Sequence, residues 1–212
     1  MNILRSPLDA LKRARRPYLV LNGAYYGLIA VTMVYSTLDR TLQEALGQLV
    51  LQALGGGPLG AVVEAFTAGQ ALLAIGLIFA INLLLATFVT LTLPSLIVPF
   101  SGLPLLALRA VLWGLLFAPQ FQAPIGTRDV LSGLGIAGLI LLEGQGYVLA
   151  GLGAFVQGRA LLWPSSVDAE GPGQGYWYGL KEQAKLYALI VGVLLVAAVY
   201  EVLLLVVTTS VQ

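Results

Sequence analysis

The 212-residue chain is 58% hydrophobic and only 10% charged, and its formal net charge is +1. Its mean hydropathy is +0.91. Because a soluble domain carries about 25% charged residues, this chain has too little polar surface to cover a water-soluble globule of its size. The composition predicts an integral membrane protein, and the near-neutral charge gives no sign of a nucleic-acid partner.

Cysteine and histidine are both missing from the sequence. The lack of Cys excludes disulfides, thiolate metal sites and cysteine nucleophiles. The lack of His excludes histidine-ligated haem or chlorophyll, most zinc sites, and Ser-His or Cys-His catalytic pairs. We therefore expect no metal, no cofactor and no enzymatic activity.

Residues 1–16 form a basic segment ahead of the first apolar run. The segment holds five basic residues and one acid, namely Arg5, Lys12, Arg13, Arg15, Arg16 and Asp9. Its leucines recur at helical spacing, which predicts an interfacial helix with its basic face toward anionic headgroups. The alternative is a topology signal without a partner. We expect residues 17–212 to form a single transmembrane helical domain.

The first predicted span runs from Tyr18 to Leu38. The apolar run is longer than the roughly 7–15 residues of a signal-peptide core, and no A-x-A cleavage site follows it. We therefore interpret it as a retained membrane helix. Gly23 and Gly27 form a G-x-x-x-G pair, a pattern typical of close helix packing in membranes.

An amphipathic stretch follows the first span. Apolar residues from Leu42 to Ala53 fall on one helical face and glutamines largely on the other. This predicts a helix of about 14 residues, too short and too polar to span a bilayer. The run Gly55-Gly56-Gly57-Pro58 then breaks it, and a turn or two leads into the next span. We expect these elements at the outer face of the membrane.

The second and third spans are separated by a proline-rich stretch. The second is predicted from Ala71 to Leu93, ending at Pro94, with Asn82 near its middle. The third is predicted from Leu105 to Phe117, beginning near residue 95 with a kink. It contains Arg109, which we expect to pair with a carboxylate of another span because an isolated charge is costly in hydrocarbon.

The fourth span lies between Val130 and Pro164 and contains the carboxylate of Glu143. Four small residues recur at every fourth position of this helix, namely Gly146, Ala150, Ala154 and Gly158. On a helix they form one smooth ridge that a neighbouring helix can approach closely. The span is therefore expected inside a helix bundle. The last span is predicted from Leu186 to Val207, with an interruption at Tyr200-Glu201.

These elements predict an all-α, polytopic membrane helix bundle with about five transmembrane helices and one or two interfacial amphipathic helices. The leader's basic residues, with Arg159, Lys181 and Lys185, lie on one side of such a bundle, whereas only Arg40 and Arg128 lie on the other. The asymmetry predicts a cytoplasmic N-terminus and an extracytoplasmic C-terminus. No internal repeat supports an inverted-repeat transporter.

The fourth span also carries the best match to a known family. The segment reads LLEGQGYVLAGLGAFVQGRALLWP and resembles the stage II sporulation protein M family, with a glutamate, an alanine/glycine-rich stretch and an x-A-L-L-x-P exit. Similar matches are IFAINLLLATF in the second span and LLVAAVYEVLLLVV, with its late glutamate, in the last. The chain departs from the family at Leu139, where a His is frequent.

The resemblance implies a bacterial or archaeal cell-membrane protein. The founding member of the family takes part in septal peptidoglycan remodelling, as a membrane scaffold alongside cell-wall hydrolases. Other members are suspected to be permease components of ABC-type transporters. Both roles imply a protein partner in the membrane, and the small-residue ridge adds the alternative of a homo-oligomer.

One polar residue stands in each of four predicted spans, namely Asn82, Arg109, Glu143 and Glu201. If they converge, they form a buried polar cluster. We favour a structural network that decides which helices pack together. The alternatives are a polar cavity for a lipid headgroup, ion or peptide, and an intramembrane acid-base centre. No nucleophile or set of metal ligands accompanies them.

Two functions are consistent with these sequence features. The first is a non-enzymatic membrane scaffold or assembly subunit, which predicts a dry, fully packed core. The second is a permease-like transport component with a separate ATPase, since the chain has no G-x-x-x-x-G-K-[ST] loop. It predicts a water-accessible cavity that reaches the charged residues, and a cytoplasmic coupling helix.

Overall fold

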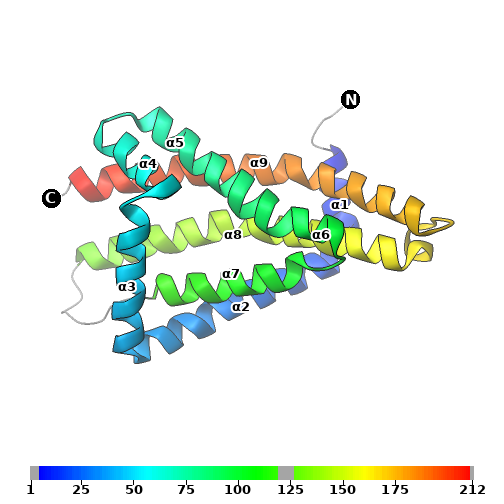
Figure 1. Cartoon of the computed structure of the whole chain (residues 1–212), viewed down its shortest axis with the longest axis horizontal. Coiled ribbons are helices and arrows are strands. Elements are labelled where there is room, and N and C mark those ends of the chain that lie inside the picture. Colours follow the sequence, from blue (N-terminus) through cyan, green and yellow to red (C-terminus); the bar gives the residue numbers. More distant parts are fainter. Residues whose placement is uncertain (1–4, 119–126, 211–212) are drawn as a thin grey trace.

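The computed structural model describes residues 5–118 and 127–210. Within these ranges every regular element is a helix, in agreement with the all-α prediction. Figure 1 shows the long helices running side by side along the long axis of the molecule, while α3 (Arg40–Leu54) crosses their direction at one end. This is the arrangement of a membrane helix bundle.

In the part of the chain that the structure describes, four helical segments are long and apolar enough to cross a bilayer. They are Arg15–Leu38, Ala71–Ile97, Gly133–Leu162 and Pro172–Val207. The first is α2 (Arg15–Leu38), the third lies in α8 (Thr127–Leu162) and the fourth in α9 (Pro172–Ser210). The second is a continuous run of three elements, α5 (Ala71–Ala80), η1 (Ile81–Thr92) and α6 (Leu93–Ile97). The fifth apolar helix, α7 (Gly102–Leu116), is shorter. Its 15 residues extend about 22 Å at 1.5 Å per residue, less than the roughly 30 Å of a bilayer core.

Helix α8 lies at the centre of the bundle, where it contacts α2, η1, α6, α7 and α9. Within its membrane-spanning window 67% of the residues are buried, against 28% or less in the other three long segments. The other helices turn large apolar side chains outward, including Val31, Leu72 and Val196, which are 67%, 86% and 57% exposed. Side chains so apolar and so exposed are suited to lipid rather than water.

The second span does not end at Pro94 as predicted. The helix continues to Ile97, because a 12-residue π-helix from Ile81 to Thr92 is followed directly by α6, which begins one residue before the proline. Pro94 therefore stands inside a continuous helical run, as the second residue of α6. The kinked start predicted near residue 95 belongs to this helix.

The turn between α6 and α7 is held by a serine and an aromatic ring. Ser95 Oγ donates to the Leu91 carbonyl at 2.8 Å and accepts the Gly102 N–H at 2.8 Å. Phe100 adopts a left-handed backbone conformation with φ 65°. Its ring packs beside Trp163, with ring centroids 6.1 Å apart. This turn sets the start of α7 against α8.

Helix α9 runs without interruption through Tyr200 and Glu201. The interruption predicted there is one of the apolar run and not of the helix, because Glu201 lines a cavity shared with α8. The loop predicted at 165–175 is shorter than expected, since η2 (Pro164–Val167) and the first turn of α9 occupy much of it. Figure 1 shows the α8–α9 hairpin reaching beyond the other helices.

Two helices follow α2 at the end of the bundle opposite this hairpin, where Figure 1 shows α3 and α4. Helix α3 covers the predicted amphipathic stretch, and α4 (Gly57–Thr67) begins within the predicted glycine-proline break. Gly57 has φ 62°, a conformation that favours glycine. Pro58 then occupies the first turn of α4, where its fixed φ suits a helix start.

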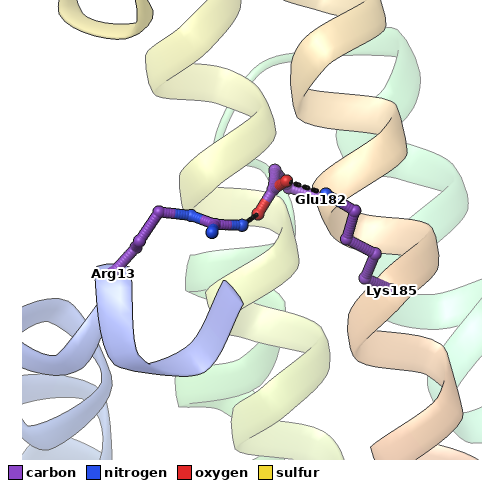
Figure 2. Close-up of polar contacts among 3 residues, drawn as sticks. All are labelled: Arg13, Glu182 and Lys185. Carbon is purple, nitrogen blue, oxygen red and sulfur yellow. Dashed lines mark hydrogen bonds and ion pairs between the residues drawn. The ribbon is translucent and has the colours of Figure 1, made fainter. Parts of the chain in front are cut away.

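The basic N-terminal helix α1 (Arg5–Arg13) packs on α9. Arg13 Nη2 lies 2.6 Å from Glu182 Oε2, and Lys185 contacts the other oxygen of the same carboxylate (Figure 2). The hydrogen bond to Glu182 raises the pKa of the Arg13 guanidinium further. The basic face expected to meet lipid headgroups therefore contributes at least one arginine to an intramolecular contact.

Candidate functional site

A cavity of about 650 Å³ lies between α4, α5, η1, α7, α8 and α9. All four predicted polar residues, Asn82, Arg109, Glu143 and Glu201, line it. The rest of the lining is apolar: Pro58, Leu59, Val62, Val63, Phe66, Ile78, Ile81, Leu85, Trp113, Leu116, Phe117, Leu139, Ile140 and Leu205. The fold thus brings one polar side chain from each of four helices to a single cavity.

The polar groups lie deeper than much of the apolar lining. Asn82 and Glu143 are only 8% and 5% exposed, whereas Leu59, Leu85 and Leu116 are 43%, 47% and 38% exposed. A ligand reaching the polar end would therefore pass between apolar side chains. This combination of apolar walls and a few convergent polar groups is typical of small-molecule sites.

Glu143 lies in a three-membered hydrogen-bond ring at the deep end of the cavity. Asn82 Nδ2 donates to Glu143 Oε1 at 2.8 Å. The Tyr147 hydroxyl lies 2.7 Å from Asn82 Oδ1 and 3.0 Å from Glu143 Oε2. Tyr147 is completely buried. The ring joins η1 to α8 and holds the carboxyl group in one orientation.

Arg109 does not form the ion pair predicted for it. Among the described residues, the only carboxylate within 4.0 Å of a basic nitrogen is that of Glu182, which contacts Arg13 and Lys185. The guanidinium of Arg109 instead lies over the Tyr147 ring, 3.9 Å from its centroid, and 5.7 Å from the centroid of Trp113. These aromatic faces attract the cation, and its Nε is buried without a hydrogen-bond partner.

Glu201 reaches the same cavity from α9. Its carboxyl group lies within interaction range of that of Glu143. It is half-buried, whereas Glu143 is buried. Two carboxyl groups and one guanidinium therefore share a largely apolar cavity, and their charges act strongly on one another because little water surrounds them.

Sequence reasoning missed Tyr147 and Tyr25. Tyr147 follows Glu143 by four residues, a spacing that places both on one face of α8, so the signal was present in the sequence. Tyr25 is 2% exposed and its hydroxyl has no hydrogen-bond partner. Its distance along the chain from the other polar residues left no such signal.

A second polar network connects α2 to α8 outside the cavity. Gln145 Oε1 accepts from the Tyr18 hydroxyl at 2.6 Å, and its Nε2 donates to Asn22 Oδ1 at 2.7 Å. The Tyr26 hydroxyl donates to the Leu141 carbonyl at 3.0 Å. This network pairs α2 with α8, as the hydrogen-bond ring pairs η1 with α8.

The ridge Gly146, Ala150, Ala154 and Gly158 is buried within this chain. A Cβ added at Gly146 would meet Leu194 of α9 at 2.6 Å, and one at Gly158 would meet Phe100 at 2.9 Å. The ridge therefore packs against two different neighbours, because positions four apart drift around a helix. In this conformation it is not available to a second copy of the chain.

The structure gathers no group of three or more acidic residues that could hold a metal ion, within the ranges that it describes. No family model, curated protein or solved structure matches the chain. The resemblance to the stage II sporulation protein M family therefore stays a prediction that rests on the sequence motifs alone.

Proposed function

We propose that this chain is the membrane-embedded, permease-like component of a transporter, and that the cavity around Asn82, Arg109, Glu143 and Glu201 is its substrate site. The cavity carries the proposal. About 650 Å³ of space reaches all four polar side chains. A small-molecule site typically has a volume of about 300–1,000 Å³.

A scaffold needs no such cavity. Its core would be packed as densely as other protein interiors, since voids and unpartnered polar groups weaken a fold. Here Arg109 Nε and the Tyr25 hydroxyl are buried without partners beside or near the cavity. We therefore favour the transport component over the scaffold.

Helix α1 supports the same function from the predicted cytoplasmic side. It is a basic helix of nine residues held against α9 by the contact between Arg13 and Glu182. Such a surface helix, attached to a membrane-spanning one, is the coupling helix that we expect of a permease with a separate ATPase. The chain has no phosphate-binding loop of its own, so a separate subunit would hydrolyse ATP.

Cysteine labelling tests whether the cavity admits water. The chain contains no cysteine, so each introduced thiol is the only one. Ile81 lines the cavity, whereas Leu84, on the same helix, is 54% exposed and lies outside the cavity lining. We expect a charged, membrane-impermeant thiol reagent to modify Ile81→Cys but not Leu84→Cys, because the reactive thiolate forms only in contact with water.

Equal protection of both thiols would contradict the proposed site. Labelling of Ile81→Cys should also slow when Leu59, at the exposed part of the lining, is replaced by Trp and narrows the entrance. The partner is tested separately, by purifying the protein from its native host in mild detergent. Recovery of an ATPase supports the permease, whereas recovery of cell-wall enzymes would favour the scaffold.

A further inference from the structure

The hydrogens available to the hydrogen-bond ring at Glu143 can be counted. Tyr147 has one hydroxyl hydrogen, yet its oxygen lies within hydrogen-bond distance of both Asn82 Oδ1 and Glu143 Oε2. Neither of these oxygens can donate if Glu143 is ionised. One of the two contacts would then lack a hydrogen.

A proton on Glu143 Oε2 completes the ring. Asn82 Nδ2 donates to Glu143 Oε1, Glu143 Oε2 donates to the Tyr147 oxygen, and Tyr147 donates to Asn82 Oδ1. Every contact then has one hydrogen and one acceptor. Since all three side chains are buried, a satisfied ring is favoured over one with an unpaired acceptor.

Charge balance independently calls for one proton on the carboxyl pair of Glu143 and Glu201, and the ring places that proton on Glu143. The charged or titratable groups around Glu143 are Arg109 of α7, Glu201 of α9, Tyr147 of α8 and Tyr25 of α2. With one proton on the carboxyl pair, the positive charge of Arg109 and the remaining negative charge cancel. Two ionised carboxylates would leave one uncompensated negative charge in an apolar cavity, which is costly.

We propose that the cavity binds a hydrophobic monovalent cation in exchange for the proton held at Glu143. The inference rests on the proposed function and names its substrate class. When the cation enters, the O–H bond of Glu143 breaks and the proton passes to water, so the net charge of the cavity is unchanged. The exchange is independent of whether a partner ATPase drives the cycle.

The walls of the cavity fit such a ligand. Most of the lining is apolar, and Phe66, Trp113 and Phe117 present aromatic rings. Aromatic faces attract cations while apolar surfaces accept hydrocarbon. A hydrophobic anion would meet the carboxyl groups of Glu143 and Glu201 at the deep end, where Arg109 is already stacked on Tyr147.

The test compares tetraphenylphosphonium with tetraphenylborate, an anion of the same shape, on the full chain in lipid nanodiscs. Calorimetry in buffers of different ionisation enthalpy counts the protons released. We expect tetraphenylphosphonium to bind with release of about one proton and an affinity that rises about tenfold per pH unit while Glu143 is protonated. Tetraphenylborate should bind at least tenfold more weakly.

Glu143→Gln is the informative variant because it keeps the ring. The amide Nε2 can donate to Tyr147 as the protonated carboxyl group does, so the variant should fold. It should bind tetraphenylphosphonium more weakly, without proton release and without pH dependence. Glu182→Gln, outside the cavity, should behave like the wild type.

Binding of the cation without proton release would overturn the exchange. Equal binding of the two probes would overturn the cation class. If Ile81→Cys is nevertheless labelled, the proposed cavity function survives either result. If Ile81→Cys is protected, the proposed function fails and the inference fails with it.

Discussion

Tyr147 connects the two features that distinguish the cavity. Its hydroxyl contacts Asn82 and Glu143, while its ring lies against the guanidinium of Arg109. The residue is completely buried, so each of these contacts forms away from water. A single side chain thus orients a carboxyl group and holds a cation that has no carboxylate in direct contact.

The hydroxyl of Tyr147 should therefore matter for stability. Tyr147→Phe keeps the ring over Arg109 but leaves Asn82 Oδ1 without its donor. We expect a loss of about 1–3 kcal/mol in unfolding free energy, seen as a lower midpoint of thermal unfolding in detergent. Tyr35→Phe, at a position 59% exposed, is the control and should have little effect.

The stability of Glu143→Gln tests whether Arg109 is an ionic partner of Glu143. With Arg109 as a buried ionic partner, the substitution would strand a charge and destabilise the protein strongly. The structure puts the guanidinium on Tyr147 instead. We expect the thermal midpoint of Glu143→Gln to stay close to that of the wild type, whereas Glu143→Leu lowers it because Asn82 and Tyr147 lose a partner. Equal effects of the two changes would contradict the ring.

At the scale of elements, the close approach of α2 to a neighbouring helix occurs at Gly114 and not at the predicted pair Gly23 and Gly27. Nothing lies within 4 Å of a Cβ built at Gly23 or Gly27. A Cβ at Gly114 would instead collide with Thr32 Oγ1 and lie 2.5 Å from the Ile29 carbonyl oxygen. The backbones of α2 and α7 therefore approach each other at Gly114, and the G-x-x-x-G pair faces away from this contact.

This difference gives a matched pair of substitutions. Gly114→Ala should destabilise the protein by about 1–3 kcal/mol, because the Ile29 backbone cannot move aside without shifting α2. Gly23→Ala should be neutral or stabilise α2 by up to about 1 kcal/mol through higher helix propensity. Thermal unfolding of both variants in the same detergent is the measurement. Destabilisation by Gly23→Ala alone would reverse the assignment.

Figure 2 shows the polar contact between α1 and α9, in which Arg13 meets Glu182. The Arg13 side chain is 52% exposed, whereas that of Glu182 is only 7% exposed. Because water reaches half of the Arg13 side chain and screens its charge, the contact contributes little to global stability, about 0–1 kcal/mol. Glu182→Gln should therefore leave the thermal midpoint nearly unchanged but loosen α1 locally.

Hydrogen exchange separates these two effects. Amides of α1 should exchange several-fold faster in Glu182→Gln, while those of α2 stay as in the wild type. Glu170→Gln, near the tip of the α8–α9 hairpin, serves as the control because it does not contact α1 in any described hydrogen bond or ion pair. Unchanged exchange in α1 would mean that apolar packing alone holds this helix.

At the scale of the whole molecule, the distribution of basic residues predicts the topology in the membrane. We expect the loop before α5 outside the cell and the α8–α9 tip inside. Gln70→Cys should react with an impermeant thiol reagent on intact cells, and Ser166→Cys only after permeabilisation. Both positions are exposed. The opposite pattern would invert the predicted orientation.

The sequence alone determined the kind of protein and much of its order along the chain. Few charges and long apolar runs leave only a membrane helix bundle, because backbone polar groups must be satisfied internally in lipid. Burying polar and charged side chains in lipid is also costly, and this cost singled out Asn82, Arg109, Glu143 and Glu201. These four residues line one cavity.

Only the tertiary structure decided how these residues are used. Which helix faces meet depends on contacts far apart in sequence, so neither the packing glycine nor the stacking of Arg109 on Tyr147 could be read from spacing. The continuation through Pro94 depends on a π-helical segment that propensities do not encode. The cavity itself is a property of six packed elements, since the space that their side chains leave unfilled exists only once α4, α5, η1, α7, α8 and α9 are assembled.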